Sequence, residues 1–223
     1  MYRNPLFHAL NRKKMPVVVL SITCVVPKGV TVKRMKLSVL LLVMLFPTLL
    51  WAVTISDVDV PEQVHISGYD SPLVLNGAGV RKKFFISIYV GALYLPQRQQ
   101  GTGQLLQSPP ANRVLMHFVY SKVAKRKVDD TWREGFDLNL DAPTREAMAT
   151  RLEQFVGLFN DLAEGDRVWI DFVPGRGTQV SINEKVRGTI EGDDFNAALL
   201  AIWFGREPVS ESLKNAMLGV DTP

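Results

Sequence analysis

The chain has 223 residues, of which 47% are hydrophobic and 22% are charged, a composition that excludes fibrous, collagen-like and low-complexity proteins. Its formal net charge is +4, but residues 1–52 contain eight Lys and Arg and no Asp or Glu. Residues 53–223 therefore keep 18 Lys and Arg against 22 Asp and Glu. The basic balance belongs to the first 52 residues, and the remainder gives no support to nucleic-acid binding.

The N-terminal segment has the pattern of an export signal. A basic stretch, Lys33 to Lys36, precedes an apolar run from Leu37 to Ala52, the order of a secretory signal peptide. A membrane-spanning helix needs roughly 20 apolar residues and Pro47 would interrupt this one, so a retained anchor is the weaker alternative. We expect residues 1–52 to be a leader with its start codon at Met35, cleaved near Ala52, and the protein to be exported to a bacterial periplasm.

Residues 53–223 are expected to form one domain. The single cysteine, Cys24, lies in the leader, so this domain can form neither a disulfide nor a cysteine metal site. Its two histidines, His65 and His117, are 52 residues apart and belong to no zinc-binding motif. We therefore expect no metal and no cofactor.

The element pattern of this domain predicts an α+β fold. Segments rich in β-branched and aromatic residues predict strands at 53–60, 73–78, 84–95, 113–120, 168–173, 178–183 and 185–189. Apolar residues at spacings of three and four predict helices at 129–140, 143–163, 192–204 and 209–218. Runs of strands followed by runs of helices favour a largely antiparallel sheet with helices packed on one face.

Two polar segments have more than one interpretation. The Pro174 to Gly177 segment lacks the Lys-Ser/Thr ending of a phosphate loop and is better explained as a hairpin turn. A cluster of Lys122, Lys125, Arg126 and Lys127 could contact anionic lipid headgroups at a membrane surface, and a solvated face explains it equally well.

The segment from Asn76 to Leu95 resembles a known family. It contains Gly77-Ala78-Gly79-Val80-Arg81 and a strand that ends in Tyr94-Leu95, which is similar to the pattern of chalcone isomerase-like proteins. Together with 202–209 and 213–219, the resemblance covers about 53–219. It implies an open-faced β-sandwich with a ligand cleft between the sheet and the helices. Enzymes of the family cyclise a chalcone to a flavanone, and related non-catalytic members bind fatty acids.

The resemblance also implies site residues. Arg81 matches the arginine of the family's cleft, and Asn139 follows Trp132 at the spacing that separates a tyrosine from an asparagine in the enzymes. Trp132 stands in place of that tyrosine, and Tyr89 in place of a threonine. An indole N–H cannot reproduce a phenol's hydrogen bonding to a water on the ketone.

We therefore expect Arg81, Tyr89, Trp132 and Asn139 to bind a small apolar or fatty-acid-like anion without turning it over. The alternatives are an intramolecular lyase of the chalcone isomerase type and a scaffold for an exported partner protein. Each residue also has a structural interpretation: core packing for Tyr89 and Trp132, a helix C-terminal cap for Asn139, and a surface ion pair for Arg81.

Overall fold

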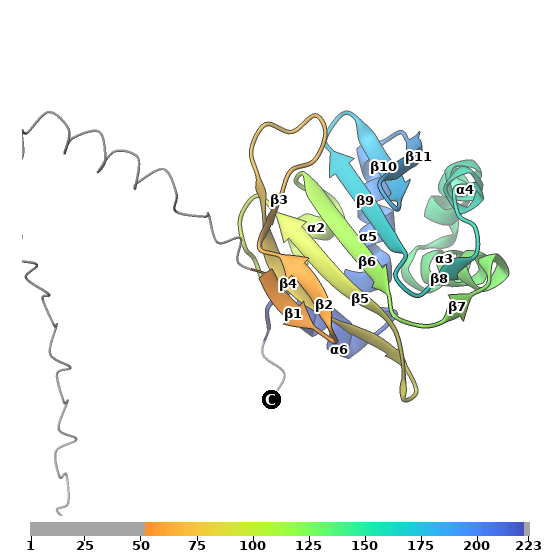
Figure 1. Ribbon diagram of the computed structural model, residues 1–223. Coiled ribbons are helices and arrows are strands. Elements are labelled where there is room, and N and C mark those ends of the chain that lie inside the picture. Colours follow the sequence, from red (N-terminus) through yellow and green to blue (C-terminus); the bar gives the residue numbers. More distant parts are fainter. Residues whose placement is uncertain (1–51, 221–223) are drawn as a thin grey trace, which may run out of the picture. The chain divides into compact units, whose positions relative to one another are not determined.

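The computed structural model describes residues 52–220, which form an α+β domain, as the sequence predicts (Figure 1). Seven strands form one antiparallel sheet in the order β11-β10-β9-β6-β5-β4-β3. These strands are β3 (Gln63–Val64), β4 (Leu73–Lys83), β5 (Ile86–Leu95), β6 (Asn112–Phe118), β9 (Arg167–Val173), β10 (Gly177–Ile182) and β11 (Lys185–Ile190). Residues 1–51 of the expected leader, with its start codon, lie outside the described residues, and Ala52, near which the sequence predicts cleavage, begins strand β1 (Ala52–Ile55).

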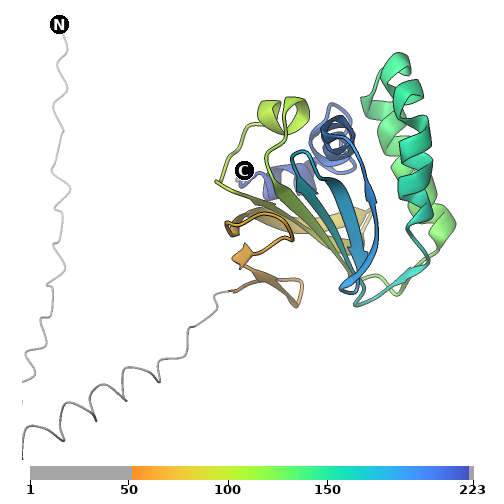
Figure 2. The same ribbon diagram turned by 90° about the horizontal axis from the view of Figure 1, so that it is seen from above.

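Four short strands and five helices complete the domain. The short strands pair as β1 (Ala52–Ile55) with β2 (Val58–Pro61), and β7 (Lys122–Val123) with β8 (Leu162–Ala163). The helices are α2 (Gly103–Gln107), α3 (Lys125–Asn139), α4 (Ala142–Gly157), α5 (Asp193–Phe204) and α6 (Glu211–Met217). Figure 2 shows the helices gathered on one side of the large sheet and the β1-β2 hairpin on the other.

Strand β5 separates two hydrophobic layers because alternate side chains of a strand point to opposite faces. Tyr89 and Leu93 belong to the cluster on the helical side, whereas Val90, Ala92 and Tyr94 pack with residues from β2 and β3. All five side chains are buried. The middle of the sheet is therefore covered on both faces, which explains why β5 reads as a nearly continuous apolar run.

Some predicted boundaries were wrong. The segment 53–60 is a hairpin, because Ser56 and Asp57 both have positive φ and form the turn between β1 and β2. Helix α3 begins at Lys125 rather than Asp129, α4 ends at Gly157 rather than at residue 163, and α2 was not predicted.

A further difference concerns Phe84, which the strand prediction placed inside a core strand. Phe84 and Phe85 form the two-residue turn between β4 and β5, and both side chains are exposed, Phe84 with a φ of 56°. A non-glycine residue with positive φ is uncommon, especially a bulky one. The tip of this hairpin is therefore an exposed aromatic turn.

The glycines that precede Arg81 serve a close helix approach rather than a sharp turn. Neither Gly77 nor Gly79 has a positive φ. A Cβ at Gly77 would collide with the backbone oxygen of Ala216, and one at Gly79 would lie 2.5 Å from the Cβ of Ala216. Two glycines on β4 thus allow α6 to pack directly onto the strand that carries Arg81.

Candidate functional site

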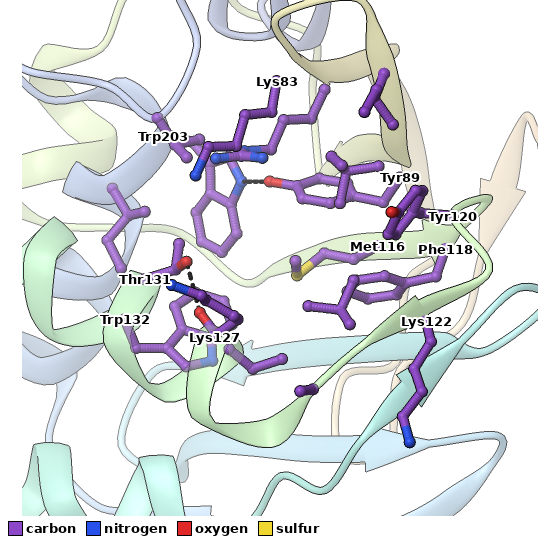
Figure 3. A pocket seen from close by; sticks show the side chains of 18 of the residues that line it. Lys83, Tyr89, Met116, Phe118, Tyr120, Lys122, Lys127, Thr131, Trp132 and Trp203 are labelled. Atoms are coloured by element: carbon purple, nitrogen blue, oxygen red, sulfur yellow. Dashed lines mark hydrogen bonds between the residues drawn. The ribbon is translucent and has the colours of Figure 1, made fainter.

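A pocket of about 480 Å³ lies between the ends of β4, β5 and β6 and the helices α3 and α5. This volume falls within the range of small-molecule sites. Its inner wall consists of the buried side chains of Tyr89, Met116, Phe118, Val128, Trp132, Ile202 and Trp203. Sheet and helices each supply part of this wall, as the family resemblance implies for a ligand cleft (Figure 3).

Lysines and exposed apolar groups surround the mouth of the pocket. The exposed members of its lining include Lys83, Phe84, Ile86, Tyr120, Lys122 and Lys127. They come from the β4-β5 hairpin on one side and from the β6-α3 segment on the other. The pocket therefore combines an apolar interior with a cationic rim.

Tyr89 and Trp203 form the central contact of the inner wall. The Trp203 indole Nε1 donates a hydrogen bond to the Tyr89 hydroxyl at 3.0 Å, drawn as a dashed line in Figure 3. Burial raises the pKa of the Tyr89 phenol, while the positive charge of Arg81 and the Trp203 hydrogen bond oppose that rise. The phenol is thus neutral at physiological pH and is held against the end of α5.

Arg81 lies directly opposite Tyr89 in the β4-β5 ladder, and its guanidinium carbon is 6.0 Å from the centroid of the Tyr89 ring. Its Nε is buried and has no hydrogen-bond partner within residues 52–220, and the side chain forms no ion pair with a carboxylate of that part. The ion-pair interpretation of Arg81 finds no partner there. A buried N–H without a partner is costly, so an acceptor brought by a ligand would stabilise this one.

Trp132 packs in the core and also lines the pocket. Its ring packs edge-on against Phe155 at 5.1 Å and against Trp203 at 5.7 Å between centroids, so it belongs to the core between α3, α4 and α5. It also lines the pocket, and its buried Nε1 has no hydrogen-bond partner in the described part of the chain.

Asn139 does not line this pocket. Its Nδ2 donates to the carbonyl oxygens of Gly135 and Glu207, at 3.0 and 2.9 Å, and its Oδ1 accepts from the Glu207 N–H at 3.0 Å. These contacts fasten the C-terminus of α3 to the segment between α5 and α6, which agrees with the cap interpretation. The structure therefore brings together Arg81, Tyr89 and Trp132 and leaves Asn139 outside.

The sequence analysis missed the contribution of Trp203. This residue is 114 positions from its hydrogen-bond partner Tyr89, and nothing in the local pattern of α5 indicates that contact. Met116 and Phe118 were missed as well, since their alternation on β6 only predicts that they face one side of the sheet.

The described residues show neither a group of acidic, histidine or cysteine side chains able to hold a metal ion nor a helix with the length and apolarity that a bilayer crossing needs.

The fold is thus an α+β domain with a pocket between an antiparallel sheet and its covering helices, a common position and size for small-molecule sites. The chain belongs to the chalcone isomerase-like family, because the family model described as "Chalcone isomerase-like" matches residues 52–219. Comparison with curated protein sequences gave no match. Among solved structures, a fatty-acid binding protein of Arabidopsis thaliana has a TM-score of 0.61 at 16% identity, covering 75% of this chain and 96% of that one. At this identity the likeness shows the fold.

Replacement of Tyr89 by Phe should lower the free energy of unfolding by about 1–3 kcal/mol, because it leaves the buried Trp203 N–H without an acceptor. Urea unfolding followed by circular dichroism measures this change. Tyr120→Phe is the matched control, since Tyr120 is exposed, and it should leave stability unchanged. Equal stability of the two variants would show that the hydrogen bond contributes nothing net.

Proposed function

We propose that this protein is an exported carrier that binds a small apolar carboxylate, such as a fatty acid, in the pocket and does not turn it over. The observation that carries the proposal is the Arg81 Nε, buried beside an apolar pocket without a partner among the described residues. A guanidinium can form two parallel hydrogen bonds with a carboxylate, and an apolar chain would fill the remaining volume. The fatty-acid binding of a protein with the same fold gives the proposal further support.

The polar groups that line the pocket favour binding over catalysis. Arg81 and the Trp132 indole offer hydrogen-bond donors, and Thr131 donates its hydroxyl to the Lys127 carbonyl at 2.8 Å. The Tyr89 hydroxyl already accepts the Trp203 N–H, and its raised pKa keeps it protonated. The free donors, Arg81 Nε and Trp132 Nε1, suit an anionic ligand, whereas among residues 52–220 no carboxylate or histidine lines the pocket to remove a proton.

Removal of the arginine tests the binding mode. Arg81→Ala should weaken binding of oleate by about 1.5–3 kcal/mol, the range for hydrogen bonds to charged groups, which is roughly a 10- to 150-fold rise in Kd. Arg81→Lys should recover only part of this loss, because it keeps the charge and loses the planar fork. Isothermal titration calorimetry with oleate measures both.

The control for this experiment is Lys82→Ala, which removes a neighbouring cation whose side chain does not line the pocket. It should leave oleate affinity in solution unchanged. A different outcome, in which Arg81→Ala lowers the melting temperature by many degrees and keeps the affinity, would make Arg81 a structural residue and remove the basis of the proposal.

The alternative function is intramolecular lyase activity of the chalcone isomerase type, and the exchange of the enzymes' tyrosine for Trp132 argues against it. Purified protein mixed with naringenin chalcone should not speed the loss of the chalcone's visible absorbance beyond the spontaneous rate. Chiral chromatography of the product provides the second readout. Enantioselective cyclisation well above background would establish an enzyme in place of a carrier.

Export is part of the proposal and rests on the leader sequence. Intact-mass measurement of the protein recovered after expression of the full chain in a bacterium should give an N-terminus near Val53 in the periplasmic fraction. The same spectrum under native conditions should show the added mass of a bound small molecule. A chain that begins at Met1 in the soluble cytoplasm would contradict export, and a scaffold for a partner protein would carry no added mass.

A further inference from the structure

The exposed apolar surface of the domain is concentrated beside the pocket. Seven large hydrophobic side chains of residues 52–220 are exposed, and four of them gather at one place: Phe84, Phe85 and Ile86 at the hairpin tip and Tyr120 across the mouth. Phe85 is 98% exposed and Phe84 87%. Single exposed hydrophobic residues are ordinary, but a contiguous group at the rim of a binding pocket indicates an interaction site.

The hairpin tip extends beyond its neighbour in the sheet. The β5-β6 ladder ends at the pair Tyr89 and Phe118, whereas the β4-β5 ladder continues to the pair Lys83 and Ile86. In Figure 1 the tip accordingly projects past the end of β6. The aromatic turn can therefore contact a partner surface or a lipid interface without disturbing the core.

The turn residues themselves run against local preference. Two-residue hairpin turns favour Asn-Gly or a leading Gly, since these residues accept a positive φ, yet Phe84 occupies such a position with a φ of 56°. Its side chain gains nothing from the fold to offset this strain, being almost fully exposed. An apolar side chain in a strained and solvated position is therefore explained by a contact that it makes outside the folded domain.

The cations around the tip identify the kind of surface that it fits. Lys82, Lys83, Arg126 and Lys127 form no ion pair within residues 52–220. Two nearby cations are neutralised by ion pairs, Lys122 with Asp161 and Lys125 with Asp129. One further acidic residue, Asp130, is exposed on helix α3. The excess of positive charge around an apolar tip is complementary to an anionic lipid surface.

We propose that the β4-β5 hairpin inserts Phe84, Phe85 and Ile86 into the interface of an anionic bilayer. Lys82, Lys83, Arg126 and Lys127 then face the lipid headgroups, and the mouth of the pocket opens onto the membrane. An apolar carboxylate can pass between bilayer and pocket without crossing water. The transfer step rests on the proposed carrier function, whereas the membrane contact depends on the surface alone.

Sedimentation with vesicles tests this contact, using protein from the full chain with the N-terminus of every variant checked by mass. Wild type should bind vesicles of phosphatidylcholine and phosphatidylglycerol at 3:1, and more weakly at high salt. Phe85→Ser should lower the partition coefficient between vesicles and water about tenfold, because the variant has less apolar surface to bury in the lipid. Leu138→Ser is the matched control, since Leu138 is exposed near the far end of α3 from Lys125, and should bind as wild type does.

The charge is tested separately. Arg126→Gln should lower binding to these anionic vesicles about fivefold, as one cation near a charged membrane surface does, and should leave binding to pure phosphatidylcholine unchanged. Neither Phe85 nor Arg126 lines the pocket, so both variants should keep the oleate affinity of wild type in solution. If the wild-type protein does not bind oleate, the carrier function is overturned, while the result of the vesicle experiment still stands.

A tryptophan at the tip locates the contact even if another segment also binds lipid. Phe85→Trp should gain a blue-shifted emission on addition of the anionic vesicles, beyond any change in the wild-type protein. An added tryptophan that stays water-exposed on the vesicles overturns the proposal. Equal vesicle binding by wild type and Phe85→Ser also overturns it. So does an absence of vesicle binding by wild type, and self-association through this face would then identify a second copy of the chain as what covers the tip.

Discussion

Helix α5 is packed between the sheet and α3, and its burial determines both the core and the site. Nine of its residues are buried, including Phe195, Leu199 and Trp203. A helix that is apolar on all sides has to be enclosed, so sheet and helical layer are held together by its burial. Near its C-terminal end, the buried Ile202 and Trp203 face residues of the first half of α3 and of β5 across a cavity. The pocket occupies that position, with Trp203 in its wall.

The contact between Trp203 and Tyr89 connects this core to the ligand site. One hydrogen bond satisfies two buried polar atoms, and the same two rings form part of the pocket wall. Tyr89 in turn lies opposite Arg81, which belongs to β4. The position of β4 depends on the close packing of α6 against Gly77 and Gly79. The glycine motif and the C-terminal helix, although distant in sequence, therefore contribute to one site.

Much of this architecture could be predicted from periodicity, and the reasons for the failures are physical. Alternation identified β9, β10 and β11, and the apolar spacing of 192–204 identified α5, because burial imposes those patterns. Phe84 was misplaced because an aromatic residue normally signals burial, and here it lies in a turn. Asn139 fitted a family spacing, but spacing along a helix does not reveal that the side chain turns to Glu207. A contact between residues far apart in the chain, such as Tyr89 and Trp203, is not indicated by the sequence around either residue.

The distribution of polar groups along the pocket gives it a direction. At the inner wall, Arg81 and Trp132 have buried N–H groups without partners among the described residues, whereas the rim carries solvated lysines and the aromatic tip. A carboxylate gains more from the inner guanidinium, because partial desolvation strengthens a charged hydrogen bond that solvent and salt would weaken at the rim. In the proposed binding mode, an amphiphile therefore has its headgroup at Arg81 and its chain along the apolar wall, toward the exposed aromatic residues of the mouth. Under the two proposals, lysines at the rim serve the approach to an anionic membrane, and the partly buried Arg81 binds the carboxylate that is retained.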